Sequence, residues 1–269
     1  MARRTDRRFL RLALLGSALV VCASGCATIT DSRTFAARGA YWRPQLDGDV
    51  RVGTSTITGT DIDVEDVLQL GDEETVLYGA ELRYGAFGID ASYFALSEDG
   101  TSLLQQTISF NGQTYSVGAN LDSSVDLNLA TAHLRWGWLG IGPLCVGAKL
   151  GANYLDVDTR LSDDLSGITV SEARDEVFPV VGGFATFDLG VLGDSLRVIA
   201  DLDVTGFGGE VKDTEGHFLD AIARVGLQTS ALSFGVGYRH LDIALEQSDR
   251  NLETDVQLSG PMVYLEIAF

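Results

Sequence analysis

Apolar and polar residues alternate one by one over many stretches of the chain, and this alternation constrains the fold more than any other feature. From 196 to 204 the even-numbered residues are apolar, while the odd-numbered ones include Arg197 and Asp203. The stretch 219–227 repeats the pattern, with apolar residues on one side and Asp220 on the other. A period of two is typical of β-strands whose two faces meet different surroundings. After the N-terminal segment no apolar run reaches about 18 residues, so the chain could cross a membrane only with strands.

The alternation and the turn signals together predict an all-β fold, an antiparallel up-and-down transmembrane β-barrel of about ten strands. Long connections near 45–74 and 98–121 alternate with tight turns, as in transmembrane barrels, whereas a soluble sandwich has no reason to sort its loops in this way. Eight or twelve strands are alternatives, because both long connections contain further β-like stretches. A change of phase near Leu129 and Ala130 predicts a β-bulge there. The ten strands are expected at about 33–44, 75–86, 87–97, 122–138, 143–159, 169–189, 194–207, 215–229, 231–247 and 253–269.

The two faces of these strands differ in a way that favours lipid outside and a narrow lumen inside. The polar face mixes charges with glycines, which leave room for long Arg and Glu side chains. Aromatic residues gather near the tight turns, as in an interfacial girdle, and Tyr93, Tyr154 and Phe178 are candidates for a second girdle. A soluble lipocalin-like barrel, anchored by lipid and with its apolar face inside, is the alternative fold.

The first 25 residues are expected to be a signal peptide that the folded protein lacks. Five arginines precede a short apolar run, and small residues follow at Ala23-Ser24-Gly25. The sequence Ser24-Gly25-Cys26 resembles a lipobox, so Cys26 is a candidate for lipidation, with ordinary cleavage nearby as the alternative. Residues 26–269 are then expected to form one barrel domain. Loss of five arginines and one aspartate lowers the net charge from −19 to −23, which argues against nucleic acid as a partner.

The final residues carry a resemblance to a known group of proteins. Val263, Leu265, Ile267 and Phe269 alternate with other residues up to the carboxyl terminus, and Gly237-Tyr238-Arg239 lies in the preceding strand. This is similar to the C-terminal strand of bacterial outer-membrane proteins, which usually ends in Phe and is read by the barrel assembly machinery. The chain resembles the small barrels of the OmpA, OmpX and OmpW group. The resemblance implies a place in the bacterial outer membrane, with lipid and the assembly machinery as partners, but it fixes no function.

Charged residues on the polar face are nearly balanced between acids and bases. A balanced set in a narrow barrel favours mutual ion pairing, because a buried unpaired charge is costly. A packed, ion-paired lumen with a structural or surface-interaction role is therefore expected, and a narrow passive pore for small polar solutes is the alternative. The candidate lumen charges are Glu81, Arg83, Arg135, Lys149, Arg197, Asp201, Asp220, Arg224, Arg239 and Glu266.

Signals for catalysis are weak. His217 lies close to Asp213 and Glu215, and a histidine beside a carboxylate can act as a general base, so a barrel hydrolase is a further alternative. No nucleophile elbow, zinc-protease motif or phosphate-binding loop accompanies it. The acidic run that includes Asp61 and Asp63 lacks the EF-hand spacing and is expected to be a solvated loop. The sequence therefore predicts a protein that is not an enzyme and needs no cofactor or metal, and it leaves the ligand open.

Overall fold

The structure is a computed structural model that describes residues 35–53, 59–63, 74–163, 168–191, 195–211, 214–247 and 252–269. The expected signal peptide and the candidate lipidation site at Cys26 lie outside the described residues. No helix among the described residues is long and apolar enough to cross a membrane.

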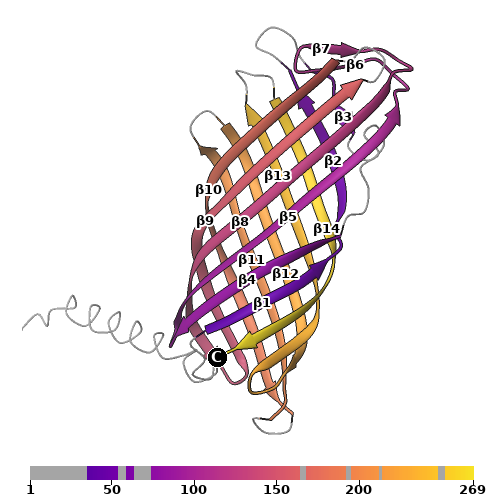
Figure 1. Ribbon diagram of the computed structural model, residues 1–269. Coiled ribbons are helices and arrows are strands. Elements are labelled where there is room, and N and C mark those ends of the chain that lie inside the picture. The colour runs from indigo at the N-terminus through magenta and orange to yellow at the C-terminus, as the bar shows by residue number, and fades with distance from the viewer. Residues whose placement is uncertain are drawn as a thin grey trace, which may run out of the picture.

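The described residues form a closed antiparallel barrel of ten strands, which confirms the predicted fold class (Figure 1). Each strand pairs with its sequence neighbour, and the last strand pairs with the first. The strands of the wall are β1 (Phe35–Trp42) continued by β2 (Gln45–Val52), β4 (Thr75–Tyr84), β5 (Phe87–Leu103), β8 (Asn120–Ile141), β9 (Leu144–Asp163), β10 (Ile168–Gly190), β11 (Arg197–Val211), β12 (Thr214–Gln228), β13 (Leu232–Gln247) and β14 (Leu252–Ala268).

The first strand is longer than the sequence predicted. β1 and β2 both pair with β14 in one unbroken register, with Trp42 opposite Met262 and Gln45 opposite Ser259. Between them, Pro44 has no N–H to give to a ladder, and Arg43 donates its backbone N–H to the carbonyl of Pro261 on β14. The predicted loop 45–74 is therefore wrong at its start, because the strand runs on to Val52.

The turns that join β4 to β5, β8 to β9 and β12 to β13 lie at one end of the barrel, together with both described ends of the chain (Figure 1). β4 and β5 are joined by Gly85 and Ala86, and β8 and β9 by Gly142 and Pro143. Gly85 and Gly142 have φ angles of 58° and 57°, which a glycine adopts without strain. In transmembrane barrels this is the periplasmic end. We call the half of the barrel next to it the periplasmic half and the other the outer half.

The predicted loop 98–121 is shorter than expected and has structure of its own. β5 continues to Leu103 and β8 begins at Asn120. Between them β6 (Ile108–Phe110) and β7 (Gln113–Tyr115) form a hairpin. Its turn is Asn111-Gly112, with φ angles of 45° and 76°, as the Asn-Gly sequence favours. At the neighbouring loop, β3 (Ile62–Asp63) adds a short pairing to β2.

Halfway along the barrel the polar and apolar faces of a strand change places, as β8 shows. In the periplasmic half, His133 and Arg135 point inward while Leu134 is exposed on the outside. In the outer half, Leu127 and Leu129 are buried inside, and the outward positions carry residues such as Asp126 and Asn128. The inward face of β8 is thus polar in the periplasmic half and mainly apolar in the outer half.

This exchange corrects the bulge predicted near Leu129 and Ala130. The register of β8 against β9 is unbroken from Leu121 to Gly137, and its irregularity lies between Gly137 and Leu139. The side chains keep their faces through Leu129 and Ala130; only the polarity of each face changes. The apparent change of phase marks the point where the outward face of the strand changes from apolar to polar.

The length of the strands agrees with a barrel that projects from the membrane. The 22 residues of β8 span roughly 50 Å along the barrel axis, given about 3.3 Å per residue and a tilt near 45°. The apolar band of a transmembrane barrel is about 25 Å tall. Exposed Tyr78, Tyr93 and Tyr154 lie at the level of the exchange, where an outer girdle is expected. Phe178 was wrongly placed in that girdle, since it points inward and is 2% exposed.

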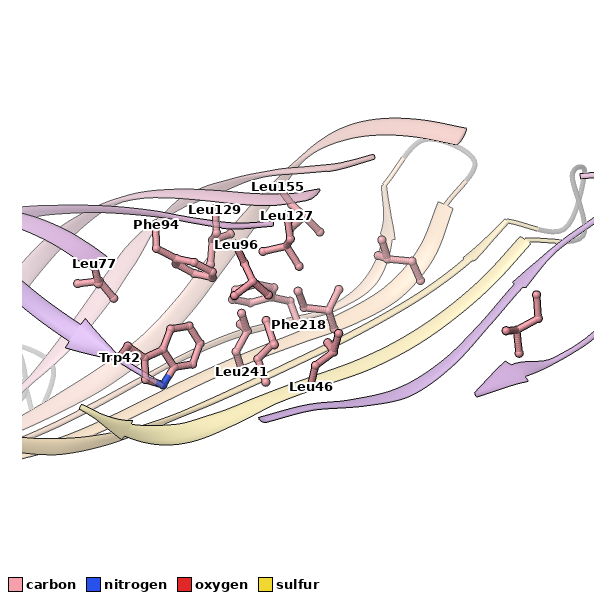
Figure 2. Packing of buried hydrophobic residues seen from close by; sticks show 14 of the residues in the cluster. Trp42, Leu46, Leu77, Phe94, Leu96, Leu127, Leu129, Leu155, Phe218 and Leu241 are labelled. Atoms are coloured by element: carbon pink, nitrogen blue, oxygen red, sulfur yellow. The ribbon is translucent and has the colours of Figure 1, made fainter. Parts of the chain in front are cut away.

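The hydrophobic core of the molecule fills the outer half of the lumen. Figure 2 shows Leu96, Leu127, Leu155 and Leu241 converging from different strands onto one another. Trp42 and Phe94 lie at the periplasmic end of this cluster, with their rings 5.1 Å apart and nearly perpendicular. The outer half therefore has the layout of a water-soluble barrel, and the periplasmic half has that of a membrane barrel.

Candidate functional site: the barrel lumen

Near the periplasmic end, Glu81 on β4 holds two arginines. Arg83 donates to both carboxylate oxygens of Glu81, at 2.6 and 2.8 Å, and Arg135 donates to one of them at 2.8 Å. The guanidinium of Arg135 also lies over the ring of Phe184, 4.1 Å from its centre. Gly147 leaves room for that ring, because a Cβ there would lie 2.4 Å from it. One carboxylate, two guanidinium groups and one ring thus fill this level of the lumen.

A second network lies towards the middle of the barrel. The ammonium group of Lys149 donates to Asp90 and to Asp203, both at 3.1 Å. Arg224 donates to the other oxygen of Asp203 at 3.0 Å. His133 contacts Asp90 through Nδ1 at 3.1 Å and Asn153 through Nε2 at 2.9 Å. Acids and bases alternate across this network, so Lys149, Arg224, Asp90 and Asp203 each have a partner of opposite sign.

Two further pairs line the periplasmic mouth. Arg197 donates through Nε to Asp188 at 2.7 Å, and Arg38 donates through Nε to Glu266 at 3.0 Å. Asp201 accepts a hydrogen bond of 2.8 Å from the hydroxyl of Thr186. These contacts connect β1 with β14 and β10 with β11 across the inside of the wall.

Arg239 lies where the polar lumen meets the apolar lumen. Its guanidinium is fully buried and donates from Nε and Nη2 to the two oxygens of Asp220, each at 2.9 Å. The same group lies 5.0 Å from the ring centre of Trp42 and 4.7 Å from that of Phe94. Trp42 is held in turn by a 3.2 Å hydrogen bond from its ring N–H to the carbonyl of Gly260. Arg239, Asp220, Trp42 and Phe94 form the layer that we call the junction.

The structure places all ten candidate lumen charges on the inner face of the barrel. Six of them line the larger polar space of the lumen, and two of these six also line the space at its mouth. Three more line only the space at the mouth, and Arg239 is buried in the junction. Sequence reasoning missed Arg38. Arg38 shares one face of β1 with Ala36, Ala40 and Trp42. In so short a strand the sequence does not show which face points inward, and only the contact of Arg38 with Glu266 reveals it.

In the outer half the lumen is closed by the β6–β7 hairpin. Ile108, Phe110 and Tyr115 are each at most 1% exposed. The hydroxyl of Tyr115 donates to the carbonyl of Leu161 on β9 at 3.4 Å. At the turn, the amide of Asn111 reaches Glu172 on β10 at 3.3 Å. The hairpin therefore reaches from its own strands, β5 and β8, to β9 and β10, and we call it the cap.

The outer surface beside the cap carries exposed charges. Arg51 on β2 bridges Asp61 and Glu253, and its distance to Glu253 is 2.6 Å. Its hydrogen bond holds the pKa of Asp61 below the usual range. Burial, followed by the nearby carboxylate of Asp63, raises the pKa of Asp49. The remaining acids of this run, Glu65 and Asp66, lie outside the described residues.

His217, the candidate general base, lies outside the lumen. Its side chain is half exposed on the outward face of β12 and contacts Asp242 on β13 at 3.2 Å. Glu215 is exposed nearby, and Asp213 lies outside the described residues. The pair is separated from the buried polar networks by the barrel wall itself.

The arrangement of strands is shared with known membrane proteins. The outer membrane protease OmpT from Escherichia coli matches over 90% of this chain and 100% of its own, with a TM-score of 0.58 and 8% sequence identity. The fold is that of an outer-membrane β-barrel. The transport unit of the autotransporter AIDA-I from Escherichia coli matches this barrel over 94% of the chain and 97% of its own, with a TM-score of 0.44 and 10% identity. Ail from Yersinia pestis matches over 86% of this chain and 99% of its own, with a TM-score of 0.35 and 8% sequence identity.

At these identities the likeness concerns the fold alone, and no family model and no curated protein matches the chain. The resemblance to outer-membrane barrels stated from the C-terminal strand is confirmed at the level of the fold. The exposed apolar band of the barrel and its buried ion pairs are those of a protein that spans lipid with its periplasmic half.

Proposed function

We propose that this outer-membrane barrel is closed and non-catalytic, with a periplasmic half that anchors it and an outer half that it presents to its surroundings. The observation that carries the proposal is the junction, where Arg239, Trp42 and Phe94 meet across the lumen. An open pore needs a continuous wet path, whereas here a fully buried guanidinium lies beside two rings and is paired with Asp220.

The charge balance of the lumen supports the same proposal. The acids of the two polar networks all lie within ion-pair distance of a base, as in Glu81 with Arg83 and Arg135. A selective channel would benefit from an excess of one sign, facing a water-filled path. Paired charges stiffen the wall and leave little charge to attract a solute. The narrow-pore alternative is therefore the less favoured one.

The proposal that the barrel is not an enzyme rests on the positions of its histidines and their carboxylate partners. The protease OmpT shares the fold, but a fold does not carry a reaction with it. His217 and Asp242 lie on the outside wall, away from the lumen. His133 is 5% exposed and is held at both ring nitrogens by neighbouring side chains, so neither nitrogen is free to act on a substrate.

We further propose that the partners of the barrel are outer-membrane lipid and the barrel assembly machinery. Val263, Leu265, Ile267 and Phe269 all point outward from β14 and are between 43% and 72% exposed. This apolar ridge lies next to the seam with β1, where Phe269 donates its backbone N–H to Phe35 at 2.9 Å. An assembly factor that guides the closing strand would meet this ridge first.

Single-channel recording in planar bilayers tests the closed state. We expect the refolded protein to insert and give no steady conductance. A variant with Trp42, Phe94 and Arg239 all changed to alanine should conduct more than the native protein. Tyr41, Tyr93 and Tyr238 each directly precede one of these residues and point outward. Their triple alanine variant is therefore a matched control that should give no conductance. A sizeable steady conductance of the native protein would support the pore instead.

A further inference from the structure

The outer half of the lumen contains a chamber with a floor and a roof. The junction forms the floor, since Trp42 and Phe94 lie at the periplasmic end of the apolar cluster. The cap forms the roof, with Ile108, Phe110 and Tyr115 buried beneath it. The cluster fills most of the space between them, but a cavity of about 80 Å³ remains. By the same measure one water needs roughly 10–15 Å³, so the cavity is several waters in size.

Most of the wall of this cavity is aliphatic. Its apolar residues come from strands on opposite sides of the barrel and contribute branched side chains, without an aromatic ring among them. Water beside this part of the wall would lack hydrogen-bond partners, and apolar space of this kind stays dry or takes up hydrocarbon. The principal aliphatic residues are Leu46, Leu96, Leu127, Leu155, Ile243 and Leu245.

The charged groups of the cavity lie on one strand. Glu172, Arg174 and Glu176 follow one another on the inward face of β10, and Glu172 also accepts a hydrogen bond from Asn111 of the cap. The other polar residues of the lining are Thr159 and Thr254. The chamber thus has one charged strip facing a mainly aliphatic wall. A ligand that matches it is an unbranched hydrocarbon chain lying along the wall.

We propose that the chamber binds one short saturated hydrocarbon chain. The size of the cavity, its mainly aliphatic wall and its closure from the periplasm carry this inference. It adds a ligand to the closed barrel proposed above and rests on that proposal for its floor, while channel recording and ligand contacts test the two separately.

Methyl-resolved NMR of the folded protein in nanodiscs of deuterated lipid tests the proposal, with n-hexane as the probe. We expect nuclear Overhauser contacts from hexane to the methyl groups of Leu127 and Leu155, which are at most 4% exposed inside the barrel. Contacts to Val263, which is 58% exposed on the outside, report hexane dissolved in the lipid. The interior contacts should saturate as hexane is added, whereas the exterior contacts should grow in proportion to it.

Two variants fill the cavity and one matched variant does not. Val125→Phe and Val157→Phe place a ring in the cavity and should each remove the interior contacts. Leu134→Phe adds the same bulk on the outside of β8 and should leave them unchanged. Folding of each variant is checked by the gel shift on heating, and either filled variant suffices if the other fails to fold. Interior contacts that are absent in the native protein, or that survive in a folded filled variant, would overturn the proposal.

Discussion

At the scale of single residues, the junction depends on one buried charge pair. Arg239→Leu should destabilise the folded barrel by about 3–5 kcal/mol, because it leaves the carboxylate of Asp220 buried without its base. Changing Asp220 to leucine as well should restore most of the loss. Guanidinium unfolding in lipid, followed by tryptophan fluorescence, measures both.

Arg51→Ala is the control, since its exposed pairs should contribute less than about 1 kcal/mol. If Arg239→Leu costs no more than Arg51→Ala, then the junction does not hold the two halves of the lumen together.

Gly147 provides a second prediction at this scale. A Cβ at this position would lie 2.3 Å from the carbonyl oxygen of Trp136 and 2.4 Å from the ring of Phe184. Gly147→Ala should therefore cost about 1–3 kcal/mol, the usual range for overpacking, and displace the ring on which Arg135 lies. Gly39→Ala adds the same methyl group where nothing lies within 4 Å, so the same unfolding experiment should find it neutral. Equal stability of the two variants would contradict this packing.

At the scale of elements, the cap can be removed without touching the wall. Replacing residues 105–118 by a short Gly-Ser linker should leave a folded barrel, because the pairing of β5 with β8 does not involve the hairpin. Leu161 is fully buried beneath Tyr115, so a cysteine in its place should react with a membrane-impermeant maleimide only when the cap is absent. A cysteine at exposed Asp126 should react in both backgrounds. Labelling of the Leu161 position beneath an intact cap would show that the roof is open.

The closing pair of strands gives a further prediction. Deleting Phe269 removes the bond to Phe35, the 5.9 Å contact between their rings and one step of the outward ridge of β14. We expect less folded, heat-modifiable protein in outer membranes while export continues, because the assembly machinery recognises the shortened closing strand less well. Deleting Phe110 in the cap is the control for loss of an aromatic residue as such. Assembly at the native rate without Phe269 would remove the support for β14 as the strand that is recognised.

The sequence predicted the elements well, except where polarity reversed along one strand. For 231–247 and 253–269 the predicted bounds agree with β13 and β14 to within a residue. For β5 the prediction stopped at Ser97, although the strand continues through Asp99 to Leu103. Beyond Phe94 the outward positions become polar at Ser97 and Asp99, while the inward ones mix Leu96 with Glu98. This loss of the earlier pattern resembles the start of a loop when a single chain is inspected, and only pairing with β8 shows that the strand continues.

At the scale of the whole molecule, the site was partly within reach of the sequence. Alternation identifies two unlike faces, and the charges on one of them, such as Arg83 and Arg224, could be assigned to the lumen before the fold was known. The aliphatic chamber could not, because Leu127 and Leu155 belong to the same inward faces as His133 and Lys149. Alternate residues of a strand point inward, so position along the strand decides which side chain lies inside. Whether that side chain meets charged or apolar neighbours depends on its height along the barrel, which a local sequence pattern does not show.

The account depends most on the claim that the barrel exchanges its lipid-facing and water-facing surfaces at the junction. Spin labels placed singly at Leu134, Ala130 and Asp126 follow the outward face of β8 from one half to the other. Collision rates with oxygen and with a nickel chelate measure lipid and water at each label. We predict that oxygen dominates at Leu134, that the chelate dominates at Asp126, and that Ala130 lies between them. A label at Asp126 that behaves like the one at Leu134 would place the outer half in lipid and contradict the account.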